Sequence, residues 1–247
     1  MARVSRGGPG SNQYQMRGAA KIAAIVPAMP KAAVTTDRRA SIRELERRLA
    51  ERYGLASDWL QEMIVAHPAL VDLVGDDPFD VAEYRRHHAG KSPAIIFDRD
   101  GTLASVELAR AHVTDGRDDW AQFNAAMLFD APVPRIAALF QAVRPGIDKI
   151  ITSGRDGSLR PRMIWWLHKH DIVPARLLMR TPKDNRRDST VKLEILQDKI
   201  LPTHDVLFVV DDRPQVVQMW RDQGFDVMAV QDPGVDPPIT RHWQEFD

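Results

Sequence analysis

The stretch Ile95-Ile96-Phe97-Asp98-Arg99-Asp100-Gly101-Thr102-Leu103 decides the fold of this chain. An apolar run leads directly into Asp98 and Asp100, and Gly-Thr follows where the chain must turn. A carboxylate at the carboxyl end of a buried strand lies where open α/β sheets bind their ligands. A second acid two residues later can donate and accept a proton beside it. We therefore predict a buried strand that ends in a catalytic pair of acids, with a plain Asp-Gly turn as the alternative.

Two further apolar runs also end in polar residues. The run over residues 149–155 stops at Ser153-Gly154, and the run over residues 206–212 stops at Asp211-Asp212. Continuous rather than alternating apolar residues are typical of a parallel sheet that is buried on both faces. The crossovers between these strands are predicted to be helices, over residues 133–143, 160–170 and 189–200. The sequence therefore predicts an α/β fold with three polar strand ends on one edge of the sheet.

These polar strand ends favour phosphate chemistry. A phosphate monoester repels an attacking carboxylate, so a divalent cation is needed to bring the two together. Oxygen ligands are those that Mg²⁺ prefers. The predicted ligands are Asp98, the backbone carbonyl of Asp100, and the pair Asp211 and Asp212. A helix cap would explain any one of these acids taken alone, but their combination favours a metal site.

The segment Asp98-Arg99-Asp100-Gly101-Thr102 resembles motif I of the haloacid-dehalogenase (HAD) phosphohydrolase superfamily. The resemblance implies a Rossmann-like parallel sheet with flanking helices and Mg²⁺ as the cofactor. It also implies that Asp98 is a nucleophile that forms an aspartyl-phosphate and that Asp100 is the general acid/base. Ser153 and Gly154 then look like motif II, which binds phosphoryl oxygens. Lys192 looks like the motif III lysine, which neutralises charge on the intermediate.

Details beyond these motifs resemble the 3′-phosphatase domain of bacteriophage polynucleotide kinase-phosphatases. The likeness covers about residues 93–230, and its most specific part is the stretch Asp-Asp-Arg-x-Gln-Val-Val-x-Met-Trp at 211–220. It implies that Arg155 binds the scissile phosphate, a role that suits a guanidinium fork. It further implies that Asp188 orients Lys192 and Arg155.

A second substrate contact is implied by the segment Gly116-Arg117, which is similar to a Gly-Arg segment between motifs I and II of the phage enzymes. Arg117 would then touch the phosphate or the substrate. The spacing from Asp98 is longer here than in the phage enzymes, so Arg110 is the alternative for this role.

The activity implied by the resemblance is removal of a 3′-terminal phosphate from DNA or RNA ends, with 2′,3′-cyclic phosphate as a further substrate. A small-molecule HAD phosphatase or nucleotidase would share every catalytic residue and is the main alternative. A binding module without catalysis is disfavoured, because no catalytic position is lost. Basic residues between 176 and 192 would guide a polyanion into the site, with a charged surface loop as the alternative. Three tryptophans, Trp120, Trp165 and Trp166, could stack on a terminal base, with packing in the core as the alternative.

The chain divides into three predicted parts. Residues 1–40 carry seven Lys and Arg and one acid, lack periodicity, and are predicted to be a disordered basic tail, with an organelle transit peptide as the lesser alternative. Residues 41–90 form a small helical module, and residues 91–247 form the HAD phosphatase domain. The module either packs against that domain or makes a homo-oligomer; direct contact of its arginines with nucleic acid is the lesser alternative.

Composition excludes several classes of protein. There is no cysteine, which excludes disulfides and thiolate zinc sites and favours a reducing, cytoplasmic compartment. No apolar run approaches the roughly 18 residues of a membrane span. The formal net charge of +0 argues against a protein that coats nucleic acid through bulk charge. Gly90-Lys91-Ser92 ends like a nucleotide-binding P-loop, but Arg85 stands where its first glycine belongs, so we expect no ATP site. The resemblance to the phage enzymes does not extend to their kinase half, so we do not expect 5′-phosphorylation.

Overall fold

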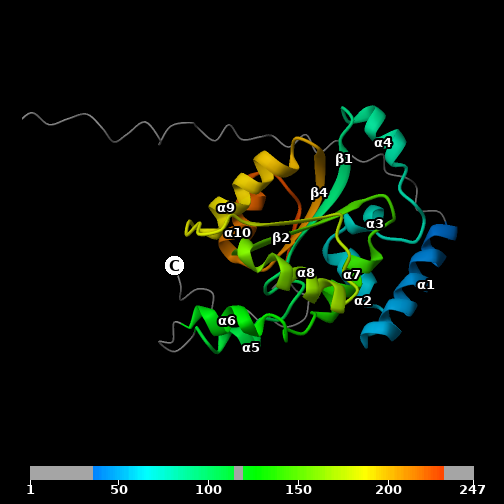
Figure 1. Ribbon diagram of the computed structural model, residues 1–247. Helices are drawn as coiled ribbons and strands as arrows, with labels where there is room; N and C mark the ends of the chain where they lie inside the picture. The colour runs from blue at the N-terminus through cyan, green and yellow to red at the C-terminus, as the bar shows by residue number, and fades with distance from the viewer. Residues whose placement is uncertain (1–35, 114–118, 231–247) are drawn as a thin grey trace, which may run out of the picture.

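The computed structural model describes residues 36–113 and 119–230, which form a parallel sheet with helices on both faces (Figure 1). The sheet has the strand order β3-β2-β1-β4-β5, and all four strand pairings are parallel. Its strands are β1 (Ser92–Asp98), β2 (Asp148–Asp156), β3 (Arg176–Arg180), β4 (His204–Asp211) and β5 (Val227–Ala229). This arrangement confirms the predicted α/β fold class.

The central strand β1 is buried at every residue, because strands flank it on both sides and helices cover both of its faces. That environment explains why its sequence is continuously apolar rather than alternating. Asp98 pairs in register with Thr152 of β2, and Phe97 pairs with Val210 of β4. Since all strands run the same way, Asp98, Ser153 and Asp211 emerge together at the carboxyl edge of the sheet.

The two faces of the sheet have separate cores. Ile95 and Phe97 of β1 pack on one face, and Ala94 and Ile96 pack on the other. The first face is covered by α1 (Thr36–Tyr53), α2 (Trp59–Ala66), α3 (Leu70–Leu73), α7 (Pro134–Ala142) and α8 (Arg160–Lys169). The second face is covered by α9 (Asp188–Ile195), its π-helical continuation Leu196–Ile200, and α10 (Pro214–Asp222). The predicted crossover helices correspond to α7, α8 and α9.

The N-terminal helices belong to the first of these cores. Leu45 and Trp59 are buried in the same cluster as Phe97 and Phe140, so the module is packed directly on the sheet domain. The prediction that the tail extends to residue 40 is wrong for its last part, because α1 already begins at Thr36. Asp37 in the first turn interacts favourably with the helix dipole, which supports this earlier start. The rest of the predicted tail lies outside the described residues.

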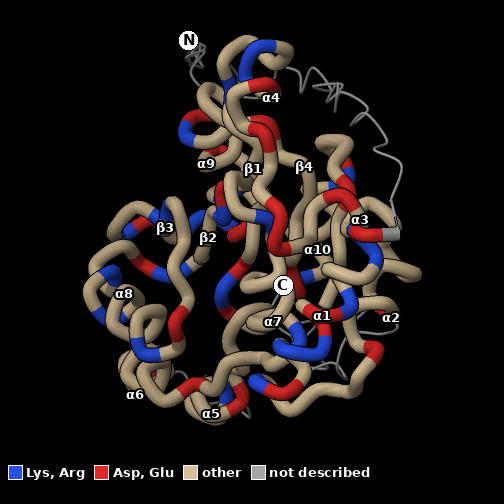
Figure 2. Tube along the Cα trace, turned by 90° about the vertical axis from the view of Figure 1, so that its right-hand side faces the viewer, with Lys and Arg blue, Asp and Glu red and all other residues tan. Residues whose placement is uncertain are grey.

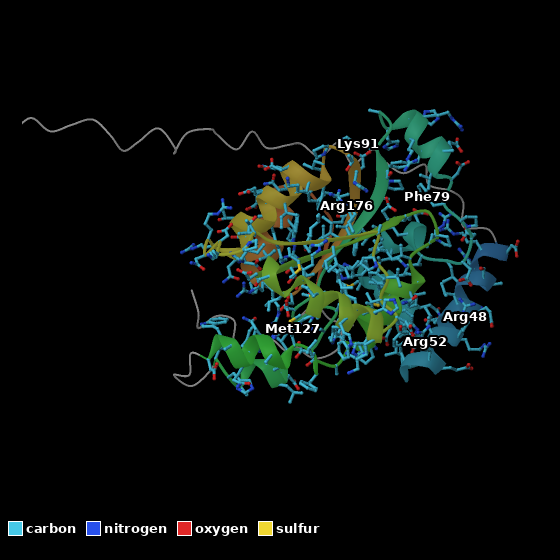
Figure 3. The ribbon with its side chains drawn as sticks, in the orientation of Figure 1. Arg48, Arg52, Phe79, Lys91, Met127 and Arg176 are labelled. Atoms are coloured by element: carbon cyan, nitrogen blue, oxygen red, sulfur yellow. The ribbon has the colours of Figure 1, made fainter. Side chains whose placement is uncertain are left out.

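The two edges of the sheet carry different additions. At the amino edge, α4 (Val81–His87) contacts β4 through the Tyr84 hydroxyl, which lies 3.3 Å from Asp205 Oδ2. At the carboxyl edge, the insertion between β1 and α7 contains α5 (Glu107–Arg110) and α6 (Trp120–Ala126), with a small apolar cluster of its own. Lys91 before β1 and Met127 after α6 mark these opposite ends (Figure 3). The insertion therefore lies beside the edge where the polar strand ends meet.

Charged residues of both signs are interleaved along the described chain (Figure 2). This distribution agrees with the formal net charge of +0. Within the described ranges, no helix combines the length and the apolar character that crossing a membrane requires.

Candidate active site

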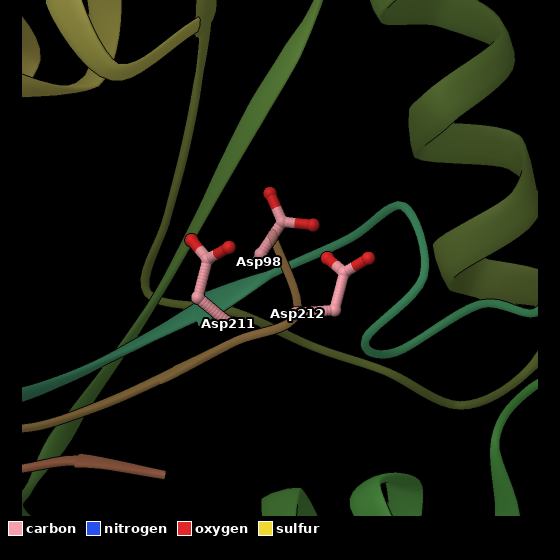
Figure 4. A group of neighbouring side chains, drawn as sticks. All are labelled: Asp98, Asp211 and Asp212. Carbon is pink, nitrogen blue, oxygen red and sulfur yellow. The ribbon is translucent and has the colours of Figure 1, made fainter. Parts of the chain in front are cut away.

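Three carboxylates meet at the carboxyl edge of the sheet. Asp98 ends β1, Asp211 ends β4 and Asp212 follows it, and their side chains project next to one another in the same direction (Figure 4). One oxygen from each lies within 4.8 Å of the others, and all three residues are buried. The backbone at Gly101 has φ +87°, and a Cβ there would collide with the Asp212 carboxylate. The glycine of the motif therefore allows the turn to pass directly over this cluster.

Lys192 of α9 is the cation at the centre of the cluster. Its Nζ donates hydrogen bonds to Asp98 Oδ1 at 2.6 Å and to Asp211 Oδ2 at 2.9 Å. Burial alone would lower the pKa of Lys192, but the charges of Asp211, Asp98 and Asp188 outweigh it and raise that pKa well above its usual value. The lysine is therefore held as an ammonium ion despite being fully buried.

One lysine does not neutralise three acids. Burial raises the pKa of Asp98 well above its usual range; Lys192 opposes this shift, and Asp211 and Asp212 add to it. Burial and the charge of Asp211 raise the pKa of Asp212 to about 7, against the opposing effect of Lys192. An excess of buried negative charge on oxygen donors alone is what a hard divalent cation requires, so the residues present fit Mg²⁺.

Asp100 faces a different set of partners. Its carboxylate accepts hydrogen bonds from Arg99 Nη1 at 2.6 Å, Arg155 Nε at 2.8 Å and Ser153 Oγ at 3.2 Å. Burial acts to raise the pKa of Asp100, but Arg155 and Arg99 outweigh it and hold that pKa well below its usual value. Its carboxylate is not part of the three-acid cluster, so a role as metal ligand would use its backbone carbonyl, as the sequence predicts.

Arg155 connects the sheet to the insertion. Its Nη1 donates to Asn124 Oδ1 at 3.1 Å, and its guanidinium carbon lies 4.3 Å from the centre of the Phe123 ring on α6. Its Nη2 is buried and has no hydrogen-bond partner within the described part of the chain. The arginine is thus fixed beside Asp100 with one donor group that its neighbours do not use.

Asp188, at the start of α9, lies under Gly154. A Cβ at residue 154 would collide with this carboxylate, which explains the glycine after Ser153. Asp188 lies 3.6 Å from Lys192 Nζ and accepts from Arg213 Nη1 at 3.3 Å and from Arg180 Nη2 at 3.4 Å. The predicted contact with Lys192 is present. The arginine partners are Arg180 and Arg213 rather than Arg155, because Asp100 and the insertion engage Arg155.

A cavity of about 500 Å³ opens in front of these groups. It lies between the strand ends, α6 and the loop over residues 180–188. Its lining includes Asp98 and Asp100 from the sheet edge, Trp120, Phe123 and Asn124 from α6, and Asp184, Asn185 and Arg186 from the loop. The cavity therefore gives a ligand access to both acids of the motif.

Sequence reasoning overlooked Arg99, which is fully buried. It donates to Asp130 Oδ2 at 2.7 Å and to the carbonyl of Met127 at 2.9 Å, and it lies 4.4 Å from the ring of Trp166. Its bond to Asp100 makes it a support for that acid. The available signal was an arginine between the two aspartates of a buried strand end, where a charge needs a partner.

The structure describes Arg110, one of the two candidates for a second substrate contact. Arg117 lies outside the described residues. Arg110 of α5 is buried, and burial lowers its pKa while the nearby charge of Asp212 opposes that shift. Arg110 is thus close to the acid cluster, but it is not among the described residues that line the cavity.

Only some of the basic residues and tryptophans that the sequence suggested as substrate contacts line the cavity. Arg176 begins β3 and lies at the far end of that strand from the site (Figure 3). Arg186 lines the cavity, but it is paired with Asp184 at 2.6 Å and Glu194 at 2.7 Å. Trp166 is a core residue whose indole N–H donates to the carbonyl of Asp130, whereas Trp120 lines the cavity.

The sequence that forms this site matches a known protein family. The profile of the family described as "Polynucleotide kinase PNKP phosphatase domain" (HAD_PNKP) matches residues 92–234, more than half of the chain. The chain belongs to this family. It is therefore a HAD-family phosphatase of the polynucleotide kinase-phosphatase type, and Asp98, Ser153, Lys192 and Asp211 all fall within the matched residues.

Relatives of this PNKP phosphatase domain include a viral protein and two solved structures. A protein of Autographa californica nuclear polyhedrosis virus, named "Putative bifunctional polynucleotide kinase/RNA ligase", is 31% identical over 130 residues, which are 52% of this chain and 18% of the viral protein. A chain from "Structure of Pnkp1/Rnl/Hen1 complex" is 30% identical with a TM-score of 0.50, over 57% of this chain and 46% of that chain. A chain from "Structure of the Pnkp1/Rnl/Hen1 RNA repair complex" is 28% identical with a TM-score of 0.50, over 64% and 45%. The present chain spans less than half the length of each of these relatives.

Proposed function

We propose that this chain is a Mg²⁺-dependent phosphomonoesterase that removes a 3′-terminal phosphate from nucleic-acid ends through an aspartyl-phosphate on Asp98. One observation carries the proposal: Asp98, which belongs to the buried cluster with Asp211, Asp212 and Lys192, lines one cavity together with Asp100 and Arg155. A single ligand in this cavity can therefore reach the nucleophile Asp98, the acid Asp100 and the phosphate-binding Arg155.

In the first step, a carboxylate oxygen of Asp98 attacks phosphorus. Lys192 holds Oδ1, so we assign the attack to Oδ2. The bond from phosphorus to the 3′ oxygen breaks, and that oxygen receives a proton from Asp100. Arg155 bonds Asp100 in this structure, and phosphoryl oxygens would compete for the same guanidinium. Substrate binding therefore removes one of the two arginine contacts that keep Asp100 ionised and leaves the contact with Arg99, so that Asp100 can take up from solvent the proton that the leaving group needs.

In the second step, water attacks phosphorus of the aspartyl-phosphate. Asp100 takes the proton from the water, and the bond between phosphorus and the Asp98 oxygen breaks. Inorganic phosphate leaves, Asp98 returns to a carboxylate, and Asp100 is again protonated for the next cycle. The same residue serves as acid and then as base, because the leaving group and the water occupy the same side of phosphorus in turn.

Several residues of the site bind the phosphoryl group rather than react with it. Arg155 offers Nη2, which is buried and without a partner in the described structure, and Ser153 offers its hydroxyl and the adjacent backbone. Asp188 holds Lys192 in place. Asp98, Asp211 and Asp212, with the backbone carbonyl of Asp100, would hold Mg²⁺, which when bound supplies positive charge against the charges of the phosphate and the acids.

The proposed substrates are 3′-phosphorylated DNA or RNA ends, with 2′,3′-cyclic phosphate ends as an extension. The family match and the relatives named for polynucleotide kinase and RNA repair support a nucleic-acid substrate. A small-molecule phosphatase would use the same catalytic residues. Phosphate release from 3′-phosphorylated oligonucleotides, mononucleotides and sugar phosphates in the presence of Mg²⁺ separates the two functions, and a preference for the small esters would contradict the proposal.

The central experiment replaces Asp98 by Asn. Removal of the nucleophile should lower phosphate release from a 3′-phosphorylated oligonucleotide by about 10⁴-fold or more. The variant Asp76→Asn changes an exposed acid outside the cavity and should keep full activity. Melting curves of both variants show whether the fold is intact. Undiminished turnover by a folded Asp98→Asn variant would refute the assignment of the nucleophile.

A further inference from the structure

Trp120 is a large aromatic side chain that the fold leaves exposed. It is the first residue of α6, it is 53% exposed, and it lines the cavity in front of Asp98 and Asp100. Its position is fixed, because Asp119 caps the helix by accepting a hydrogen bond from the Gln122 N–H at 2.9 Å. An exposed aromatic ring that lines a cavity beside charged groups is a feature that a ligand can use.

A continuous set of contacts connects this ring to the reacting groups. Arg155 Nε bonds Asp100 at 2.8 Å, and the Arg155 guanidinium carbon lies 4.3 Å from the Phe123 ring centre. The Phe123 ring in turn packs edge to face against Trp120, with centroids 5.4 Å apart and an angle of 72° between the planes. Phe123 therefore lies between Arg155 and Trp120 and contacts both of them.

We propose that the exposed part of the Trp120 ring stacks on the base of the terminal nucleotide whose 3′-phosphate Arg155 binds. This inference rests on the proposed function and narrows it, because it makes a nucleobase next to the phosphate part of what the site recognises. Stacking suits an enzyme that accepts ends of any sequence, since every base has a π-face. Phe123 contacts both Arg155 and Trp120, so the phosphate and the base are read by one connected unit.

The chain provides a matched control for this tryptophan. Trp165 on α8 is 52% exposed, but it is not among the described residues that line the cavity. Replacing Trp120 or Trp165 by Ala therefore removes a similarly exposed tryptophan from two different places. Trp120→Phe retains an aromatic face in the original place.

The test compares two oligonucleotides that differ only at the terminal nucleotide. Both carry a 3′-phosphate, but one has a normal base and the other has a stable tetrahydrofuran abasic residue. Wild-type protein should show a higher kcat/KM on the normal end. Trp120→Ala should lose about tenfold in kcat/KM on the normal end and little on the abasic end, in line with the energy of base stacking. Trp120→Phe should recover most of the loss, and Trp165→Ala should match wild type on both ends.

Each outcome of this experiment has a defined meaning. A Trp120→Ala variant that matches wild type on both ends, or that loses activity equally on both, would overturn the stacking role. A wild-type protein that is inactive on every 3′-phosphorylated end would instead overturn the proposed function. The circular dichroism melting curves of the variants separate either result from a loss of folding.

Discussion

Acids are buried in two regions of this molecule, and their partners differ. Glu46 of α1 is 1% exposed, and its two oxygens accept hydrogen bonds from the backbone N–H groups of Leu60 and Gln61 and from the Gln61 side chain, at 2.8 to 3.0 Å. The two backbone N–H groups belong to the first turn of α2. Such groups have no hydrogen-bond acceptor within their own helix. Each oxygen of Glu46 therefore has a donor, and the acid holds two helices together.

The acids at the carboxyl edge of the sheet are buried to the same degree but face one another. Asp98 and Asp211 share Lys192, and the pKa of Asp212 is raised by burial and by Asp211. Burial of an acid therefore does not by itself mark a site. Buried acids that crowd one another do indicate a functional site, because the crowding destabilises the fold and is retained where a ligand or a function requires it.

The largest effect that distinguishes the two regions is expected from Lys192→Met. Loss of the ammonium group leaves Asp98 and Asp211 without their shared donor. The metal-free variant should lose about 3–5 kcal/mol in its free energy of unfolding, because a buried charge group has lost its partner. Its kcat should fall by about 10²- to 10³-fold, as for removal of a group that stabilises a transition-state charge. Urea unfolding and phosphate release measure the two quantities.

Lys91→Met is the matched control, since Lys91 pairs with Asp205 at 3.5 Å at the opposite edge of the sheet. It should leave kcat unchanged. A Lys192→Met variant with wild-type stability would show that the crowded acids do not depend on the lysine.

A divalent cation should bind at the cluster of Asp98, Asp211 and Asp212 and not at Glu46. At a Mg²⁺ concentration of about 100 times Kd, the free energy of unfolding should rise by about 2.7 kcal/mol, since the cation binds only the folded chain. Asp212→Ala removes one proposed ligand and should weaken this rise, whereas Glu46→Ala should retain it. An equal rise in the Asp212→Ala variant would place the cation elsewhere.

The strand ends of the site were predictable because two local facts determine them. Continuous apolar runs ending in Asp98, Ser153 and Asp211 specify buried strands, and parallel strands present their carboxyl ends at one edge. The register of β1 against its neighbours then places the acids together. Chain position alone was sufficient for this part of the site.

The supporting contacts were not predictable, because they join residues that are distant in sequence and depend on side-chain direction. Arg99 reaches Asp130, which is 31 residues away, and Glu46 reaches the start of α2. Trp165 and Trp166 are adjacent in sequence, yet one is 52% exposed and the other is fully buried. The helical pattern did not show which ring faces the core, since that depends on how α8 packs on the sheet.

The acid with full partners should matter to stability alone. Glu46→Ala leaves the N–H groups of Leu60 and Gln61 without acceptors in a buried place, which should cost about 1–3 kcal/mol in the free energy of unfolding. Its kcat and KM should equal those of wild type. Glu51→Ala on the same helix removes an exposed acid and should keep the wild-type melting temperature. A loss of activity in folded Glu46→Ala would mean that the two regions are coupled.

The smallest effect is expected at an exposed ion pair that connects α1 to the turn after α8. Arg52 Nη2 lies 3.0 Å from Asp171 Oδ2, and the two side chains are 49% and 76% exposed. Because water and salt screen this pair, a double-mutant cycle with Arg52→Met and Asp171→Asn should give a coupling energy of about 0.2–1 kcal/mol that declines with added salt. The short distance in this pair therefore predicts little stability, whereas similar distances at Glu46 and Lys192 predict much more, since those groups have left water. A coupling energy as large as the Glu46→Ala effect would show that proximity rather than burial sets the strength of polar contacts here.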